Sequence, residues 1–310
     1  MTILVTGATG TVGRHVVRGL AERGEPVRAF VRDAAAPTAR GLGPGVRLAE
    51  GDFADRGTVE RALAGVDRLF LACGNVPGQV GYEQAMIDAA AAAGVGRVVK
   101  LSGPDPYPES PLVFDSWHGV IERHLARSGL PAVLLRPRTY LTNLLANARA
   151  VAATGMLFAP ASTAEISFVD PRDVADVAVE CLLGVGHVGR AYTLTGPEAI
   201  TFERVAAELS AATGRPVRYV HVSDDDARHA MIGDGLPPMV AEAIVAIFAT
   251  QRTGWMATTT TDVRDVTGRQ PRSITGFARE HASLFEPAGQ ASGDGTGRGE
   301  NALLTASDLS

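Results

Sequence analysis

Lysine is almost absent from this chain of 310 residues, and cysteine is rare. Lys100 is the only lysine, so arginine supplies every other basic side chain apart from histidine. The two cysteines, Cys73 and Cys181, lie far apart and lack metal-ligand spacing, which argues against a disulfide framework and against a cysteine-bound zinc. A net charge of −5 offers no general attraction to nucleic acid, whose binding depends on basic patches. We therefore expect no bound metal and no nucleic-acid partner.

Long apolar runs are also missing. The Ala-rich stretch from residue 85 to 93 is too short to span a bilayer and contains Asp88. No signal peptide precedes the first apolar run, which begins at residue 2. An apolar fraction of 45% with 20% charged residues is typical of a globular protein, and the length allows one or two domains. These observations predict a cytoplasmic protein that does not associate with membranes.

The first apolar run leads into the most informative motif of the chain. Residues 3–13 read ILVTGATGTVG, directly before a helical pattern. A strand, a glycine-rich turn and a helix in this order bring backbone N–H groups and the positive helix end to one point, where a pyrophosphate binds. The spacing is G-x-x-G-x-x-G instead of the usual G-x-G-x-x-G, and a loop that merely needs glycines is the alternative. We predict that a dinucleotide binds at Gly7, Thr9, Gly10, Thr11, Val12 and Gly13.

Strand-like runs alternate with helical patterns through the first half of the chain. The predicted strands cover residues 2–6, 26–31, 46–50, 67–72, 96–102 and 131–136. The predicted helices cover residues 11–23, 56–65, 80–94 and 115–128. This order is typical of an α/β Rossmann-like fold, a doubly wound parallel sheet with helices on both faces. We assign residues 1–155 to this dinucleotide-binding domain.

The second half is less regular. A helix is expected to begin at Pro171, short strands cover 191–194 and 217–222, and further helices cover 201–213 and 238–250. We assign residues 156–285 to a smaller, mostly helical substrate lobe over the carboxyl ends of the strands, with some strands returning to the main sheet. Residues 286–310 are rich in Gly, Ser, Ala and Asp without periodicity, which predicts a disordered tail.

Several further motifs, in order along the chain, resemble the NmrA-like group of the short-chain dehydrogenase/reductase superfamily. They are VRAFVRD at 27–33, EGDF at 50–53, His118-x-x-x-Glu122, SGL at 128–130, LRP at 135–137, ISFVDPRDVA at 166–175 and YTLTGP at 192–197. The resemblance spans roughly residues 2–285 and implies a Rossmann-like fold, a nicotinamide cofactor and a small substrate lobe. It does not imply one activity, because the group contains quinone reductases, isoflavone-type reductases and redox-sensing regulators.

The end of the second predicted strand bears on the choice of cofactor. NAD-selective Rossmann proteins carry an acidic residue there, which binds the ribose 2′-OH. Here the strand ends in Arg32, whose guanidinium could hold the 2′-phosphate of NADP through two hydrogen bonds. A plain surface arginine is the alternative, and Asp33 could still reach a ribose hydroxyl. We predict NADP as the cofactor, with NAD as the alternative.

Two further segments are expected to follow the cofactor. Asp52 and Phe53 come after the third strand and would flank the adenine, with the carboxylate accepting from its amino group and the ring packing on its face. Cys73, Gly74 and Asn75 come after the fourth strand and would lie near the nicotinamide-side ribose, although the Cys73 thiol could simply pack in the core.

The catalytic pair typical of the superfamily is missing. Its usual members reduce carbonyls with Tyr-x-x-x-Lys, in which the lysine lowers the tyrosine pKa so that the phenol can protonate the alkoxide. None of the five tyrosines has a lysine four residues later. His118 and Glu122 stand at the matching place, one helical turn apart on the same face. An ordinary carbonyl reductase is therefore excluded.

The remaining candidates for catalysis are Ser102 and His118. Ser102 ends the fifth strand, where its hydroxyl could bond a substrate oxygen or simply cap a turn. His118 could donate a proton to substrate or hydrogen-bond the backbone. Lys100, on the same strand face as Ser102, is interpreted as structural or as a partner for a buried acid. The predicted walls of the substrate pocket, each of which could instead be ordinary core, are Trp117, Tyr140, Asn143 and Phe158.

A site without a strong general acid suits a hydride acceptor whose product anion is already well stabilised. Hydride addition to a quinone gives an aromatic hydroquinone anion, which is far better stabilised than an alkoxide, so positioning over the nicotinamide does most of the work. We predict an NADPH-dependent reductase of a quinone or polycyclic aromatic ketone. One alternative is an NADP-sensing regulator without turnover. Another is an aromatic polyketide tailoring enzyme whose dihydroquinone product reacts with dioxygen to give hydroxylation. An epimerase, dehydratase or isoflavone-like reductase is disfavoured, and a homodimer or a protein partner stays open.

Overall fold

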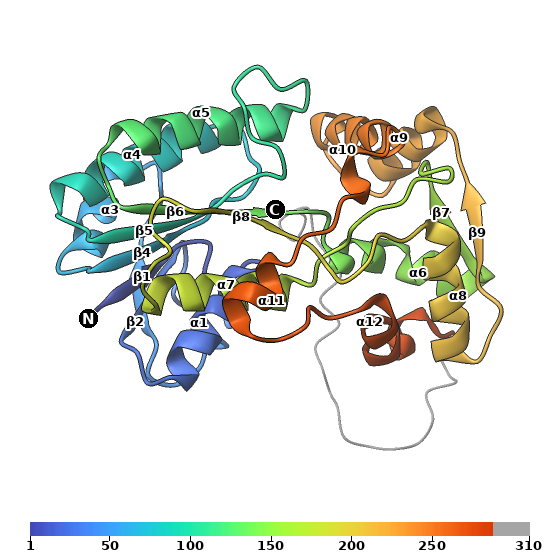
Figure 1. Ribbon diagram of the computed structural model, residues 1–310, viewed down its shortest axis with the longest axis horizontal. Helices are drawn as coiled ribbons and strands as arrows, with labels where there is room; N and C mark the ends of the chain where they lie inside the picture. The colour runs from blue at the N-terminus through green and yellow to red at the C-terminus, as the bar shows by residue number, and fades with distance from the viewer. Residues whose placement is uncertain (288–310) are drawn as a thin grey trace.

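The computed structural model describes residues 1–287 and contains a seven-stranded parallel sheet (Figure 1). The strands lie in the order β3-β2-β1-β4-β5-β6-β8. Their bounds are Ile3–Val5 (β1), Val27–Val31 (β2), Arg47–Glu50 (β3), Arg68–Leu71 (β4), Arg97–Leu101 (β5), Ala132–Pro137 (β6) and Ala191–Leu194 (β8). The strand order reverses between β1 and β4, and ligands of such sheets bind at the carboxyl ends beside that point. The predicted doubly wound parallel sheet is confirmed.

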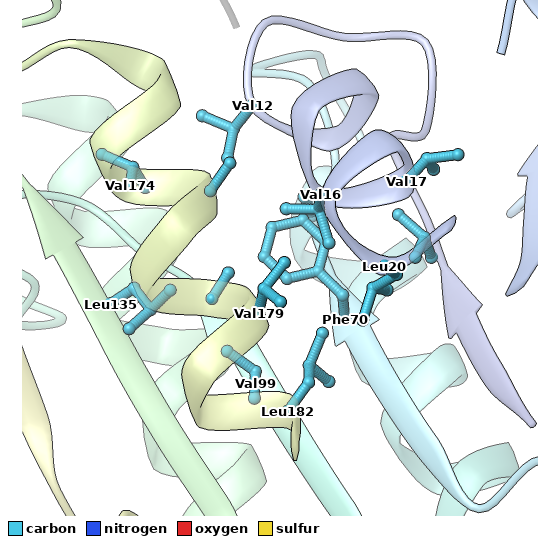
Figure 2. Close-up of a cluster of buried hydrophobic side chains, with 14 of the residues drawn as sticks. Val12, Val16, Val17, Leu20, Phe70, Val99, Leu135, Val174, Val179 and Leu182 are labelled. Atoms are coloured by element: carbon cyan, nitrogen blue, oxygen red, sulfur yellow. The ribbon is translucent and has the colours of Figure 1, made fainter. Parts of the chain in front are cut away.

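Helices cover both faces of this sheet (Figure 1). One face carries α1 (Gly13–Glu22), α7 (Pro171–Leu183) and α11 (Asp262–Thr267), and the other carries α3 (Arg56–Leu63), α4 (Gln79–Ala92) and α5 (Val113–Arg127). Strand side chains alternate between two apolar cores, as the period of a strand requires. Figure 2 shows the first core, in which valines and leucines of α1 and α7 pack on Phe70, Val99 and Leu135 of the sheet. Leu69 and Val98 belong to the second core, under α3, α4 and α5.

A smaller lobe with its own core lies beyond one end of the sheet (Figure 1). Its elements are η1 (Leu141–Asn147), α6 (Ala148–Thr154), β7 (Met156–Ala159), α8 (Phe202–Thr213), β9 (Arg218–His221), α9 (Asp224–Gly233), α10 (Pro238–Gln251), η2 (Trp255–Ala257), α12 (Ile274–Glu280) and η3 (Ala282–Phe285). β7 and β9 form a separate parallel pair. Because the chain enters the lobe directly from the carboxyl end of β6, the lobe lies at the carboxyl ends of all the parallel strands.

The lobe and the sheet are interleaved along the sequence. The lobe core takes Leu144 from before residue 155 and Phe277 and Phe285 from the far end of the described chain. Between these segments the chain returns to the sheet, where α7 packs against α1 and β8 pairs with β6. The proposed division at residue 155 is therefore one of sequence order, because both lobes draw on both halves of the chain.

The predicted strands and helices of the first half are all present, with ends displaced by a few residues at most. The predicted strand 217–222 is found as β9, and the predicted helix 238–250 is found as α10. Six elements were not predicted from the sequence: α2 (Pro37–Arg40), α6, β7, α9, α11 and α12. α9 has no buried residue, so it lacks the apolar period that identifies a helix from sequence. The predicted tail 286–310 lies outside the described residues except for 286 and 287.

No helix within residues 1–287 is long and apolar enough to cross a bilayer. Within that range, no group of three or more His, Cys, Asp or Glu side chains is placed to hold a metal ion.

Candidate cofactor and substrate site

The glycine turn between β1 and α1 is closed by contacts that leave no room for side chains. Gly7 has a left-handed φ of +58°, and a Cβ built there would lie 3.1 Å from the carbonyl oxygen of Ala72. A Cβ at Gly13 would lie 2.0 Å from the carbonyl oxygen of Gly7. Gly10 N donates to that same oxygen at 3.0 Å. Gly7 and Gly13 thus allow the first turn of α1 to lie directly against the loop.

The amino end of α1 is prepared for an anion. Its N-cap, Val12, supplies no side-chain cap, and its first turn contains no acidic residue. Helices α3, α7, α8, α9 and α12, in contrast, each have an Asp, Ser or Thr that caps the backbone N–H groups. The amino end of α1 thus has no side-chain cap, as is also true of α4, α5, α10 and α11, and its N–H groups are available to a negatively charged ligand. The turn fits the pyrophosphate of a dinucleotide, and the assignment of Thr9 and Thr11 to that ligand stays a prediction.

Thr6 fixes the base of this turn. Its hydroxyl donates to the carbonyl oxygen of Ala72 at 2.8 Å and accepts from Ala72 N at 2.9 Å. The side chain is completely buried. β1 and β4 are thereby tied together where the strand order reverses, directly below the expected pyrophosphate position.

Arg32 and Asp33, at the end of β2, differ in whether their side chains already have hydrogen-bond partners. Asp33 Oδ1 accepts from Ala35 N at 2.7 Å and so closes the turn that leads into α2. Arg32 is exposed, and none of the hydrogen bonds or ion pairs within residues 1–287 involves its guanidinium. The arginine is thus the available group at the position that selects between NAD and NADP.

Asp52 and Phe53, which are predicted to contact adenine, differ in how far their side chains are already engaged. Asp52 Oδ1 already accepts from Ala54 N at 2.8 Å. Phe53 lies edge-on to Phe30, with ring centroids 5.5 Å apart, and is stacked on Tyr82 at 6.4 Å. The Phe53 ring is half-buried, so part of it stays available for a planar ligand. Contacts of Asp52 and Phe53 with adenine stay predictions.

The segment from Cys73 to Asn75 follows β4 beside the glycine turn and is half-buried. Burial, followed by the nearby charge of Glu83, raises the pKa of Cys73 to about 12. A thiol with such a pKa is not nucleophilic near neutral pH, which agrees with a packing role. Val76 N donates to Gly74 O at 2.8 Å and turns the chain toward α4.

Lys100 pairs with a buried acid, as predicted. Its ammonium lies 2.8 Å from Glu83 Oε2, and both side chains are fully buried. Lys100 Nζ is also 3.2 Å from His118 Nδ1. Glu122, the other residue of the motif, instead pairs with Arg136 at 2.6 Å. Although His118 and Glu122 share a face of α5, they have different partners, and only His118 lies against the end of β5.

Polar atoms without partners gather around the carboxyl ends of β5 and β6. Within residues 1–287, such buried atoms include Ser102 Oγ, Asp115 Oδ2, Arg138 Nε and Gln251 Oε1. Asp115 borders Gly103, since a Cβ built there would lie 2.4 Å from Asp115 Oδ1. Because a buried polar atom without a hydrogen bond is costly, these atoms are suited to meet a ligand.

Residues from the small lobe complete this region. The Arg138 guanidinium lies over the ring of Trp255 at 4.3 Å from its centroid, and Arg138 donates to Pro104 O at 3.4 Å. Gln251, at the end of α10, donates to Thr139 Oγ1 at 3.0 Å. The loops after β5 and β6 thus contact residues of the lobe at the carboxyl ends of the strands.

The four predicted pocket residues are half-buried and come from different elements. Trp117 lies on α5, Tyr140 precedes η1, Asn143 lies in η1, and Phe158 lies on β7. Trp117 is edge-on to Phe114 at 5.5 Å, and no aromatic pair within residues 1–287 joins any two of Trp117, Tyr140 and Phe158. Their role in substrate binding stays a prediction.

Comparison with known proteins decides the family. The model of the NmrA-like family matches residues 1–257. The chain belongs to the NmrA-like family. This NmrA-like chain is 40% identical to the NAD(P)H azoreductase of Xenophilus azovorans over 287 residues, which are 92% of the chain and 100% of the relative. It is 42% identical to the (4-alkanoyl-5-oxo-2,5-dihydrofuran-3-yl)methyl phosphate reductase of Streptomyces griseus over 286 residues, or 92% and 99%.

A solved structure gives a matching result. The NADPH-dependent quinone oxidoreductase of Escherichia coli, in complex with NADPH, aligns with a TM-score of 0.81 and 29% identity, covering 90% of this chain and 99% of that one. The NmrA-like resemblance is thus confirmed, and so is the prediction of an oxidoreductase of the atypical short-chain dehydrogenase/reductase type.

Four residues of this polar cluster in the NmrA-like chain were not predicted from the sequence: Asp115, Arg138, Gln251 and Trp255. Asp115 could have been found, because it lies one helical turn before His118 on the same face of α5. Arg138 follows β6 directly, at the end of the sheet where ligands bind. Gln251 and Trp255 carry no such signal, because only the folding of the lobe brings them to the strand ends.

Asp115 is expected to make stability depend on pH. Burial, and next the charge of Asp105, raises the pKa of Asp115 to about 7, above its value of 3.8 in an unfolded chain. The folded state then binds more protons than the unfolded state between these values, so the free energy of unfolding falls as pH rises through this window. Asp115→Asn should remove about 2 kcal/mol of that fall between about pH 5 and pH 8.

Urea unfolding at both pH values measures this difference. The control is Asp234→Asn, which changes an exposed carboxylate at the end of α9 and should leave the pH dependence as in the wild type. Identical pH dependence in wild type and Asp115→Asn would contradict the raised pKa.

Proposed function

We propose that this NmrA-like chain reduces a quinone or a related conjugated aromatic acceptor, such as an azo dye, with hydride from NADPH. The observation that carries the proposal is the end of β5, where Ser102 and His118 offer neutral donors in place of a tyrosine–lysine pair. Such donors suffice when the product anion is delocalised. Relatives named as an azoreductase and a quinone oxidoreductase support this substrate class.

Nicotinamide chemistry supplies the hydride, and the residues of the chain supply binding and hydrogen bonds. The glycine turn and the amino end of α1 would hold the pyrophosphate. Burial, followed by the charge of Lys100, keeps the pKa of His118 well below its usual range, so its imidazole is neutral at neutral pH. His118 and the Ser102 hydroxyl would donate hydrogen bonds to the acceptor oxygen or nitrogen as negative charge develops there. The final proton comes from water.

The prediction of NADP(H) as cofactor is confirmed by the NADPH complex of the structural relative and by the use of NAD(P)H in the azoreductase. The role of Arg32 in selecting it is our proposal. Asp33 is engaged in its own turn, which leaves the Arg32 guanidinium as the group at the end of β2 able to hold a 2′-phosphate.

Arg32→Ala should weaken NADPH binding about 10- to 100-fold, because charge-assisted hydrogen bonds to a phosphate contribute about 1.5–3 kcal/mol. NADH lacks the 2′-phosphate, so its affinity should change by less than about threefold. Fluorescence titration with both cofactors measures the dissociation constants. Arg149→Ala, at an exposed position of α6, is the matched control and should change neither. Equal losses for NADPH and NADH would refute the role of Arg32.

The activity itself is tested by following NADPH oxidation with simple and polycyclic quinones, azo dyes and a phosphorylated butenolide. We expect turnover with at least one conjugated acceptor and none with simple aliphatic ketones. No rate above buffer across the panel would overturn the proposal and would favour the NADP-sensing alternative. Oxygen incorporation into a quinone product would instead favour the hydroxylating alternative. Both alternatives stay predictions.

A further inference from the structure

A chain of buried polar side chains connects α4 to His118. Gln79 Nε2 donates to Glu83 Oε1 at 3.1 Å, Glu83 Oε2 lies 2.8 Å from Lys100 Nζ, and Lys100 Nζ lies 3.2 Å from His118 Nδ1. Gln79, Glu83 and Lys100 are completely buried, and His118 is 8% exposed. Lys100 also donates to Leu101 O. The only lysine of the protein thus has three neighbours that can accept a hydrogen bond.

The protons of this cluster can be assigned by counting donors. An ammonium has three N–H groups and no lone pair, so Lys100 would direct one each toward His118 Nδ1 and Leu101 O and keep the third for Glu83, whose Oε2 lies at ion-pair distance without hydrogen-bond geometry. If the proton instead lies on Glu83, the lone pair of the neutral amine faces that carboxylic acid, and two N–H groups remain for His118 and Leu101 O. In both arrangements His118 Nδ1 is an acceptor. The neutral imidazole must therefore carry its proton on Nε2.

The reverse tautomer would need a neutral lysine whose lone pair accepts from Nδ1–H. Glu83 would then be ionised, which leaves a buried carboxylate without a countercharge, or it would carry its proton on Oε1, the oxygen that already faces the N–H donor of Gln79. The contacts of Lys100 thus decide which nitrogen of His118 is protonated.

The Nε2 edge of His118 faces the end of β5. A Cβ built at Gly103 would lie 3.1 Å from Cδ2, the ring carbon next to Nε2. Within residues 1–287, Nε2 has no hydrogen-bond partner, and neither has Ser102 Oγ beside Gly103. Lys100 therefore contacts the Nδ1 edge of the ring, while the Cδ2 side of the ring lies against Gly103, just after β5.

We propose that Lys100 and Glu83 are positioning residues that hold His118 as a neutral Nε2–H donor toward the substrate. Gln79 donates to Glu83 Oε1, so the network runs from the first residue of α4 to His118. The kinetic part of this proposal rests on the proposed function, because it requires that His118 meets the acceptor. The tautomer does not depend on that function.

The tautomer is measured by ¹⁵N NMR of enzyme labelled in its seven histidines, with His118 assigned by the His118→Gln variant. We expect Nε2 of His118 to give the signal of a protonated ring nitrogen and Nδ1 that of a hydrogen-bonded acceptor, with or without NADPH. A proton on Nδ1 at neutral pH, whether in the other tautomer or in an imidazolium, would overturn the proposal.

The positioning role is tested by a double-mutant cycle in kcat with the best acceptor of the panel. Lys100→Met combined with Glu83→Gln removes both charges and the donor to Nδ1, and it should lower kcat about tenfold in the wild-type background. In the His118→Gln background the same pair should lower kcat by less than about twofold, because its effect passes through the ring. NADPH affinity should be unchanged in both.

Equal losses of kcat in the two backgrounds would show a merely structural role and would overturn the proposal. An unchanged kcat in the wild-type background would do the same. If the wild-type enzyme reduces none of the acceptors, the proposed function fails, and the NMR measurement alone decides whether Lys100 sets the tautomer of His118.

Discussion

Gly13→Ala should abolish cofactor binding and lower the free energy of unfolding by about 3 kcal/mol or more. The new Cβ would lie 2.0 Å from the carbonyl oxygen of Gly7 and 2.7 Å from its carbonyl carbon. Both atoms belong to the backbone, so no side-chain rotation can relieve the overlap. Either α1 or the turn must move, and each movement displaces the N–H groups that would hold the pyrophosphate.

Urea unfolding and NADPH titration by tryptophan fluorescence measure the two effects. The matched control is Gly81→Ala in α4, where a Cβ meets no atom within 4 Å. Alanine there should raise stability slightly, by up to about 1 kcal/mol, because alanine has the higher helix propensity, and NADPH should bind normally. A Gly13→Ala protein that binds NADPH as tightly as the wild type would contradict the close packing of α1 on the turn.

Lys100→Met alone should lower the free energy of unfolding by about 3–5 kcal/mol near neutral pH, because it leaves Glu83 in the core without its partner. Burial already raises the pKa of Glu83, and removal of the lysine would raise it further. The folded state would then bind one more proton than the unfolded state above pH 4.5. The loss should therefore grow as pH rises and diminish in acid.

The second substitution, Glu83→Gln, should restore most of this stability in the Lys100→Met background, since no buried charge remains. Urea titrations of both proteins at several pH values separate the two contributions. If Lys100→Met alone is as stable as the double variant at neutral pH, the two side chains do not form the buried pair.

The part of the site that depends on local sequence was predictable. Gly7, Gly10 and Gly13 stand between one strand and one helix, so a few consecutive residues determine their geometry. The partner of Lys100 was predictable only as a class, a buried acid, because a charge in a strand interior requires one. Glu83 itself could not be named, since its distance to Lys100 depends on how α4 packs against β5.

The residues proposed to meet the substrate were also less predictable, because tertiary packing, and not local sequence, brings them together. Asp115 lies one turn from His118 and has a local signal, whereas Trp255 reaches Arg138 only after the lobe has folded around α10. The elements missed in the second half are short or lack an apolar period, as in α9. Sequence periodicity describes how one element faces a core, but it does not specify which element of another lobe it meets.

Because the lobe and the sheet are interleaved along the sequence, they become complete at different times during synthesis on the ribosome. Strands β1 to β6 are complete when residue 137 has emerged, so the glycine turn can form on an early sheet. The edge strand β8 comes later, and the lobe core needs Phe277 and Phe285, which are among the last described residues to be made. Until then the apolar faces of α8 and β7 stay uncovered. The strands around the glycine turn are therefore made well before α7 can cover them, and the core of the lobe is the last part of the described chain that can close.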